Sequence, residues 1–316
     1  MSNSENNNNN NQPNTTIQKK PGRPKKKMNN IIECINKGII NEPNSCEHKM
    51  ELIYNDPKIF KKIFGMFKGY FVEDVFINFN LDNVYILTKD HTKKTIIKIC
   101  INADKVSEYF CKEPFEICIK REYLEKIFST IEKTHSKIVL FSTNNTYQSS
   151  LGVNLINDDS SVYDNYIIDL SLQNNTEDKN DIIHNINKSD YLISFRIKSK
   201  SFKKFINDTS CNGKLLTIEK IGNNHLQFKM SFNNKIQFTR TIVNEENYNL
   251  ISKLDDEDLF NINIELEFVK PFSNLNISEF VDIYVDKNKK AIFDCNVNNG
   301  FASVTIYNEI VNLVNN

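Results

Sequence analysis

The 316-residue sequence predicts an α+β fold made of two tandem like domains, with antiparallel sheets and a few amphipathic helices. Two observations predict it. From Met50 onward, short strand-like runs of apolar and β-branched residues outnumber the segments whose apolar residues recur at intervals of three and four. The order of these segments in the first half then recurs in the second half. We therefore expect two copies of one sheet-rich unit.

Two helices interrupt the strands of the first half. Residues 58–70 place Ile59, Ile63 and Phe67 on one helical face, and Pro57 suits the first turn. Residues 121–133 show the same apolar spacing. The strands of this half are expected at 50–54, 73–79, 83–88, 95–101, 114–119, 137–142 and 163–170.

The second half repeats this order. Phe-Lys-Lys at 60–62 recurs at 202–204, an offset of 142, and each copy follows a strand and opens a helix. ICIKREYLEKIF, from Ile117, matches INIELEFVKPF, from Ile262, at an offset of 145. Two matches at nearly one offset indicate a tandem duplication. After the helix that repeats the first one, strands are expected at 214–219, 225–230, 235–242, 262–267, 280–285, 291–296 and 301–307, with a further helix near 268–276.

The ends of the chain and its middle differ from these repeats. Residues 1–48 form an Asn-rich basic tail, because the chain through Lys49 holds eight Lys or Arg and four Asp or Glu. The remainder has 32 basic and 36 acidic residues, so the neutral total hides a mildly acidic body. We expect one domain at 49–170, a polar connector at 171–190 and a second domain at 191–316.

The sequence lacks the common motifs of catalysis and cofactor binding. It has eight Gly without a phosphate-binding loop, and its five His and seven Cys form neither HExxH nor CxxC. We therefore expect no enzyme, no cofactor and no metal site. No run approaches the roughly 18 apolar residues of a membrane span, and no secretory signal opens the chain, so we expect an intracellular protein without a membrane partner.

Basic residues gather on the first helix of each half. The face opposite Ile59 carries lysines and no acid, and a cluster from Arg196 to Lys204 occupies the matching place in the second half. Lysine heads on long stems suit a phosphate backbone and read no base sequence. For any one lysine a solvated helix face accounts for the pattern equally well, so only the repetition favours a nucleic-acid surface.

Four segments resemble the eukaryotic-type DNA sliding clamp family, proliferating cell nuclear antigen (PCNA). They are residues 60–90, DNYIIDL, DYLISFRIKSKSFKKFI and GFASVTIYNEI, and the resemblance spans Met50 to Ile310. It implies a ring, normally a homotrimer, with sheets outside and helices lining a hole around double-stranded DNA. It implies DNA polymerase and a clamp loader as partners and processivity as the function.

The resemblance also implies two sets of site residues. The DNA-binding cations would be Lys61, Lys62, Lys68, Lys126, Arg196, Lys203 and Lys204. The fourth helix departs from the family pattern, because Glu267 stands where the family tends to have a base. A pocket for partner peptides would involve Phe79, Asn83, Val84, Ile86, Ile186, Lys290, Tyr307 and Asn308.

Two alternatives stay open. A viral-type processivity factor of the same fold would work as a monomer or dimer on an open cationic face. A regulatory or chromatin protein would instead bind DNA through the tail, where Gly22, Arg23, Pro24 and Lys25 resemble an AT-hook. A nuclear-import signal accounts for these basic residues equally well. The Asn-, Ile- and Lys-rich usage suggests an A·T-rich genome such as that of a large DNA virus, so we expect the nucleus or a cytoplasmic viral replication site.

Overall fold

The computed structural model describes most of the chain after the tail. No helix among the described residues is long and apolar enough to cross a membrane. The residues described are 48–68, 74–90, 95–145, 148–158, 163–170, 191–210, 215–221, 225–232, 236–243, 251–252, 260–267, 269–270, 278–286 and 290–309.

Strands dominate both halves, as the sequence predicts. The helices are α2 (Pro57–Gly65), α3 (Arg121–Ser129) and α4 (Ser199–Ser210), with a 3-10 turn η1 (Ala103–Lys105). The strands of the first half are β1 (His48–Tyr54), β2 (Asp74–Phe79), β3 (Asn83–Lys89), β4 (Thr95–Asn102), β5 (Glu108–Cys111), β6 (Phe115–Lys120), β7 (His135–Asn145), β8 (Gln148–Asn157) and β9 (Tyr163–Asp169). Those of the second half are β10 (Tyr191–Lys198), β11 (Leu215–Ile221), β12 (His225–Phe232), β13 (Ile236–Val243), β14 (Ile251–Ser252), β15 (Asn261–Glu265), β16 (Phe280–Asp286), β17 (Lys290–Val297) and β18 (Ala302–Glu309).

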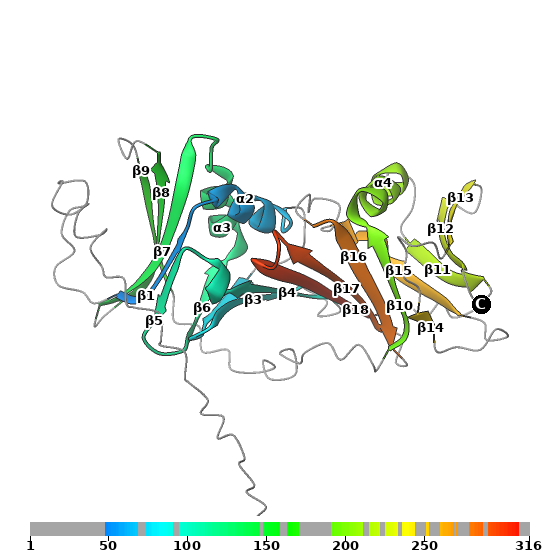
Figure 1. Cartoon of the computed structure of the whole chain (residues 1–316), viewed down its shortest axis with the longest axis horizontal. Coiled ribbons are helices and arrows are strands. Elements are labelled where there is room, and N and C mark those ends of the chain that lie inside the picture. The colour runs from blue at the N-terminus through cyan, green and yellow to red at the C-terminus, as the bar shows by residue number, and fades with distance from the viewer. Residues whose placement is uncertain are drawn as a thin grey trace, which may run out of the picture. The chain divides into compact units, whose positions relative to one another are not determined.

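The strands form three antiparallel sheets, and their order confirms the predicted pair of like domains. The five-stranded sheet runs β5-β1-β7-β8-β9, and its order recurs as β14-β10-β16-β17-β18. The four-stranded sheet runs β13-β12-β11-β15, and the first half contains the matching series β4-β3-β2-β6. The series β14-β10-β16-β17-β18 and the series β4-β3-β2-β6 join where β18 pairs with β4, which makes one nine-stranded sheet from both halves (Figure 1).

One consequence of the repeat concerns the sheet edges. β9 corresponds to β18 and β13 corresponds to β4, but β9 and β13 each stand at the end of a sheet among the described residues. Among the residues that the structure describes, β9 and β13 are therefore not paired as β18 and β4 are.

The core lies on one face of the sheets because apolar residues alternate along each strand. In β2, Val75, Ile77 and Phe79 are buried and their neighbours are half-buried. All three α-helices pack on this same face, and their apolar residues belong to one continuous core with the inward residues of the nine-stranded sheet.

Aromatic rings fix α2 against α3. The rings of Phe64 and Phe128 stack with centroids 4.0 Å apart and planes 3° from parallel. Phe60 of α2 also stacks on Phe128, at 6.0 Å. In the second half, Phe205 of α4 meets Phe228 edge-on at 5.4 Å, so both halves use phenylalanines to bind helix to helix or helix to sheet.

The sequence misplaces some boundaries and misses three strands. Both first-half helices end earlier than predicted, at Gly65 and Ser129. The sequence pattern predicts no strand at β5, β8 or β14. In β8 the outward positions include Gly152 and Asn154, which have low strand propensity and hide the alternation of Leu151, Val153 and Leu155.

The stacked pair offers a test of the core. Phe64→Ala is expected to lower the free energy of unfolding by about 3–5 kcal/mol, because it removes a fully packed ring and leaves a cavity. Chemical denaturation measures this loss. Leu81→Ala is the control, since Leu81 is 59% exposed and its truncation should change stability by less than about 0.5 kcal/mol. Equal losses in the two variants would contradict the packing described.

Candidate nucleic-acid interface and partner surface

The three helices bring several predicted cations to one side of the sheets (Figure 1). Lys62 on α2, Lys126 on α3 and Lys204 on α4 are exposed, as is Lys68 in the turn after α2. Lys203 on α4 is half-buried. Each helix turns its apolar residues to the core, so its exposed lysines lie on the side away from the sheet.

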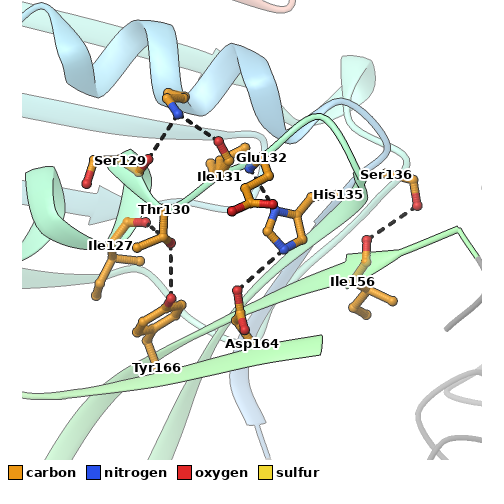
Figure 2. A network of polar contacts seen from close by, with 11 residues as sticks. Ile127, Ser129, Thr130, Ile131, Glu132, His135, Ser136, Ile156, Asp164 and Tyr166 are labelled. Atoms are coloured by element: carbon orange, nitrogen blue, oxygen red, sulfur yellow. Dashed lines mark hydrogen bonds and ion pairs between the residues drawn. The ribbon is translucent and has the colours of Figure 1, made fainter. Parts of the chain in front are cut away.

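Lys61 has a structural role that the sequence does not indicate. Its Nζ donates hydrogen bonds to the carbonyl oxygens of Ser129 and Ile131, at 3.0 and 2.7 Å (Figure 2). The ammonium therefore caps carbonyls at the C-terminus of α3, where the helix dipole favours a positive charge. The prediction that Lys61 contacts DNA stays a prediction, and the structure adds a second role, because two of the three ammonium hydrogens are engaged within the chain.

Arg196 lies on the wrong face for the predicted role. Ile193, Phe195 and Ile197 of β10 point into the core, so the alternating position of Arg196 points to the helix-free face. There its guanidinium donates to both carboxylate oxygens of Asp282, at 2.7 and 2.9 Å. It is therefore removed from the set of cations on the helix face.

The remaining charge on the helix side is uneven. On α3, Arg121 donates to Glu125 at 2.7 Å and to the carbonyl of Phe67, while Glu122 is exposed beside it. Glu267, in the helical stretch that includes residues 266–267 and 269–270, is also exposed. Acids thus interrupt the cationic surface, as the sequence predicts for Glu267.

A polar network ties the end of α3 to the edge strand β9 (Figure 2). The backbone N–H of Glu132 donates to Nδ1 of His135 at 2.9 Å, so Nε2 carries the ring hydrogen and lies 3.4 Å from a carboxylate oxygen of Asp164. Tyr166 donates its hydroxyl to Oγ1 of Thr130 at 3.0 Å. The sequence gives no signal for the contacts of His135 with Asp164 and of Tyr166 with Thr130, since they join residues 29 and 36 positions apart.

The predicted partner pocket needs a correction. Phe79, Val84 and Ile86 are only 1–3% exposed and belong to the core, because they share the inward face of β2 and β3. They are inaccessible to a peptide. Ile186 and the tail residues Gly22, Arg23, Pro24 and Lys25 lie outside the described residues.

The outward face of the same sheet carries an aromatic row instead. Cross-strand pairing sets Tyr284 opposite Ile292, Ile292 opposite Tyr307, and Tyr307 opposite Ile96. Burial raises the pKa of Tyr307 to about 12, so its hydroxyl stays neutral at physiological pH. Of this row, the sequence indicates only Tyr307. Tyr284, Ile292 and Ile96 could be found from strand alternation, once it is known which alternate positions of each strand face the core.

A family model and a solved structure agree on one fold. Residues 49–178 match the family model described as the N-terminal domain of proliferating cell nuclear antigen. The crystal structure of proliferating cellular nuclear antigen from Entamoeba histolytica is similar with a TM-score of 0.69 and 12% identity, over 84% of this chain and 100% of that chain. Uncharacterized proteins of African swine fever virus, from Kenyan pig and Namibian warthog isolates, are 24% identical over 282 residues, 88% of this chain and 93% of theirs.

The capping role of Lys61 can be tested against its neighbour. Lys61→Met is expected to lower the free energy of unfolding by about 1 kcal/mol, because two carbonyls at the end of α3 lose their donor. Lys62→Met, a matched change at an exposed lysine on the same helix, should have almost no effect on stability. Denaturant titration compares them; the assignment fails if Lys62→Met costs as much as Lys61→Met.

Proposed function

We propose that this chain, which has the sliding-clamp fold of the PCNA family, closes into a ring of copies around double-stranded DNA and tethers DNA polymerase there. Clamp proteins of this family are non-enzymatic scaffolds, so no reaction is assigned to it. The observation that carries the proposal is the β18–β4 joint together with the two unpaired counterpart edges, β9 and β13.

The internal joint supplies a template for contact between copies. An edge strand presents unpaired backbone N–H and C=O groups, which another strand can pair. If β9 of one copy pairs with β13 of the next as β18 pairs with β4, each copy offers two different surfaces. Such head-to-tail contacts close into a ring when the rotation between copies allows it. A homotrimer is the closure that the family resemblance implies.

The template also fixes a register. Leu52 corresponds to Phe195 and Ile77 to Ile218, each pair buried, and the cross-strand pairings carry these matches outward to the edges. By this route four residues of the internal joint acquire counterparts at the two edges: Val304 with Asp164, Ile306 with Tyr166, Ile99 with Arg240 and Ile97 with Phe238.

Opposed residues in an antiparallel pair share a face and interact. Because Val304 stands opposite Ile99 in the internal joint, the contact between copies would set Asp164 opposite Arg240. It would likewise set Tyr166 opposite Phe238. The apolar pairs of the internal joint are thus replaced by a charge pair and an aromatic pair, which favours joining different edges and disfavours two like edges.

The ring explains how weak contacts suffice for processivity. A closed ring stays on DNA by topology, so its cations need no tight grip. Lys62, Lys68, Lys126, Lys203 and Lys204 supply the helix-side charges, and lysine contacts to phosphate are mobile, sequence-independent and weakened by salt. Of the outward row, Tyr307 and Ile96 are half-buried and could contact the aromatic anchors of polymerase and loader peptides, whereas Tyr284 and Ile292 are buried. The protein would act in the nucleus or at a cytoplasmic viral replication site.

The register gives a charge-swap test of the ring. The wild-type mass by sedimentation is expected near three times the 36.8 kDa of the chain, and Asp164→Arg should reduce it toward one chain by opposing two positive charges. Combining Asp164→Arg with Arg240→Asp should restore assembly. A wild-type mass of one or two chains would favour the open processivity factor. An Asp164→Arg variant that keeps the full mass would refute the register.

The helix-side cations are tested by charge reversal in an assembled ring. Lys62→Glu, Lys126→Glu and Lys204→Glu together should abolish stimulation of polymerase on a primed circle. They should also flatten the dependence of DNA affinity on salt, by about 0.9 in logarithmic slope for each lost phosphate contact. Arg196→Gln is the control, because it removes a cation from the opposite face. If Arg196→Gln impairs DNA binding and the triple variant does not, the DNA-facing side is misassigned.

A further inference from the structure

We infer that the outward face of the five-stranded sheet is a separate protein-binding surface, which takes an arginine or lysine side chain of a partner onto Glu51, between the rings of Phe110 and Phe141. This surface lies on the sheet β5-β1-β7-β8-β9 and is distinct from the aromatic row of the nine-stranded sheet.

A single row of residues crosses all five strands. Glu51 on β1 stands opposite Phe110 on β5 and opposite Phe141 on β7. Phe141 stands opposite Gly152 on β8, which stands opposite Ile167 on β9. Met50 and Leu52 on either side of Glu51 belong to the core, so this row faces outward.

The row is apolar and open to solvent at both ends. Phe110 is 50% exposed and Ile167 is 54% exposed. In the row beside it, Ile53 and Val139 also face outward and are buried. The exposed apolar side chains of this face are therefore Phe110 and Ile167, at the two ends of the row, and the carboxyl group of Glu51 stands beside Phe110. A basic side chain flanked by apolar residues would match this arrangement.

Gly152 shapes the surface by letting Phe141 lie flat. A Cβ atom at position 152 would lie 2.1 Å from Cζ of Phe141 and 2.4 Å from both Cε atoms. Nearly equal distances to these three atoms mean that the ring lies face-down over the glycine. One face of the ring covers the backbone of β8. The imidazole of His48 meets the same ring edge-on, with centroids 5.2 Å apart, and burial lowers the pKa of His48, so a cation would stack on Phe141 beside an imidazole that disfavours its own positive charge.

The carboxyl group of Glu51 is influenced by one nearby cation, Lys137, but forms no ion pair with it. Among the described residues, no hydrogen bond or ion pair engages its carboxylate. Glu108 on β5 is exposed and lies diagonally from Glu51, because it stands opposite Ile53. Lys137 on β7 is the opposing positive charge. Lys49, on its own strand, pairs with Glu113 at 3.4 Å and lies over the ring of Phe115.

The electrostatics of the row favour a basic partner. Burial, then the charge of Glu108, raises the pKa of Glu51 to about 7 against the effect of Lys137. Glu51 is thus a poorly satisfied acid at neutral pH. A guanidinium or ammonium group would pair with Glu51 and Glu108 and stack on the two rings, whereas a nucleic-acid phosphate would be repelled. The occupant with matching chemistry is a polypeptide segment with a basic residue between apolar residues.

The raised pKa of Glu51 gives the sign of the pH dependence of both folding stability and partner binding. Because the folded pKa of Glu51 lies above its unfolded value, protonated Glu51 stabilises the fold at low pH, and this contribution is lost as pH rises through about 7. A cation binds the ionised form. Partner affinity should therefore rise about tenfold between pH 6 and pH 8, as the ionised fraction rises from roughly a tenth to nine tenths.

The test uses the full chain with labelled isoleucine methyl groups and two peptide probes. Acetyl-Ala-Leu-Arg-Leu-Ala-amide is compared with the same peptide carrying uncharged citrulline in place of arginine. The arginine peptide should shift the methyl signals of Ile167 and Ile53, bind at least fivefold more tightly than the citrulline peptide, and gain about tenfold in affinity from pH 6 to pH 8.

Three variants separate recognition by Glu51 from peptide binding elsewhere on the chain. Glu51→Gln should abolish both the preference for arginine and the pH dependence, and Phe110→Ser, at an exposed position, should weaken binding without a loss of fold. Glu122→Gln, an exposed acid on α3, should change neither. The inference would be overturned if the two peptides bound equally, or if Glu51→Gln kept the pH dependence of peptide binding. It would also be overturned if the peptide shifted methyl signals only of residues outside this face. So would a lower sedimentation mass for Phe110→Ser, since the face would then be a contact between copies. Assembly and polymerase stimulation by Glu51→Gln report separately on the proposed ring.

Discussion

The antiparallel pairing of β18 with β4 is the contact on which the rest of the structure depends. It converts two copies of one unit into a chain with a continuous nine-stranded sheet and a single core. Because the pairing uses the last strand of one copy and a middle strand of the other, it leaves their counterparts, β9 and β13, unmatched at sheet edges. The pairing that joins the halves is therefore the basis on which we propose β9 and β13 as the edges for contact between copies.

The continuity of this sheet also decides which side chains can act together. Residues of one parity along every strand enter the core beneath α2, α3 and α4, and residues of the other parity face away from the helices. Two basic residues of the second half that stand within eight positions of each other, Arg196 and Lys204, fall on opposite sides for this reason. The outward side divides further into the row around Tyr307 and the face around Glu51, so the described part of the chain has a lysine-bearing helix side and two separate outward faces.

The helix ends show how the fold uses some of its charged and polar groups for stability. Lys61 satisfies carbonyls at the end of α3, and the hydroxyl of Tyr166 reaches Thr130 in the same turn. His135 holds Asp164 on the edge strand. The helix side and the edge of the five-stranded sheet are therefore linked through one short segment, residues 127–135. A substitution that breaks these hydrogen bonds would therefore alter both the end of α3 and the edge strand β9, since the two elements share them.

The sequence by itself determined the fold class, the duplication and nearly every strand, because apolar periodicity is a local property and a recurring Phe-Lys-Lys is visible without coordinates. It also indicated a helix side rich in lysine. Only the tertiary structure decided which face each residue occupies. Val84 and Ile86 look like pocket residues in sequence but pack in the core, and Tyr284, Ile292 and Ile96 line the outward row. The capping by Lys61 and the pairing of Arg196 with Asp282 join residues 68 to 86 positions apart, and such contacts depend on strand register and on which strands meet, which local patterns do not encode.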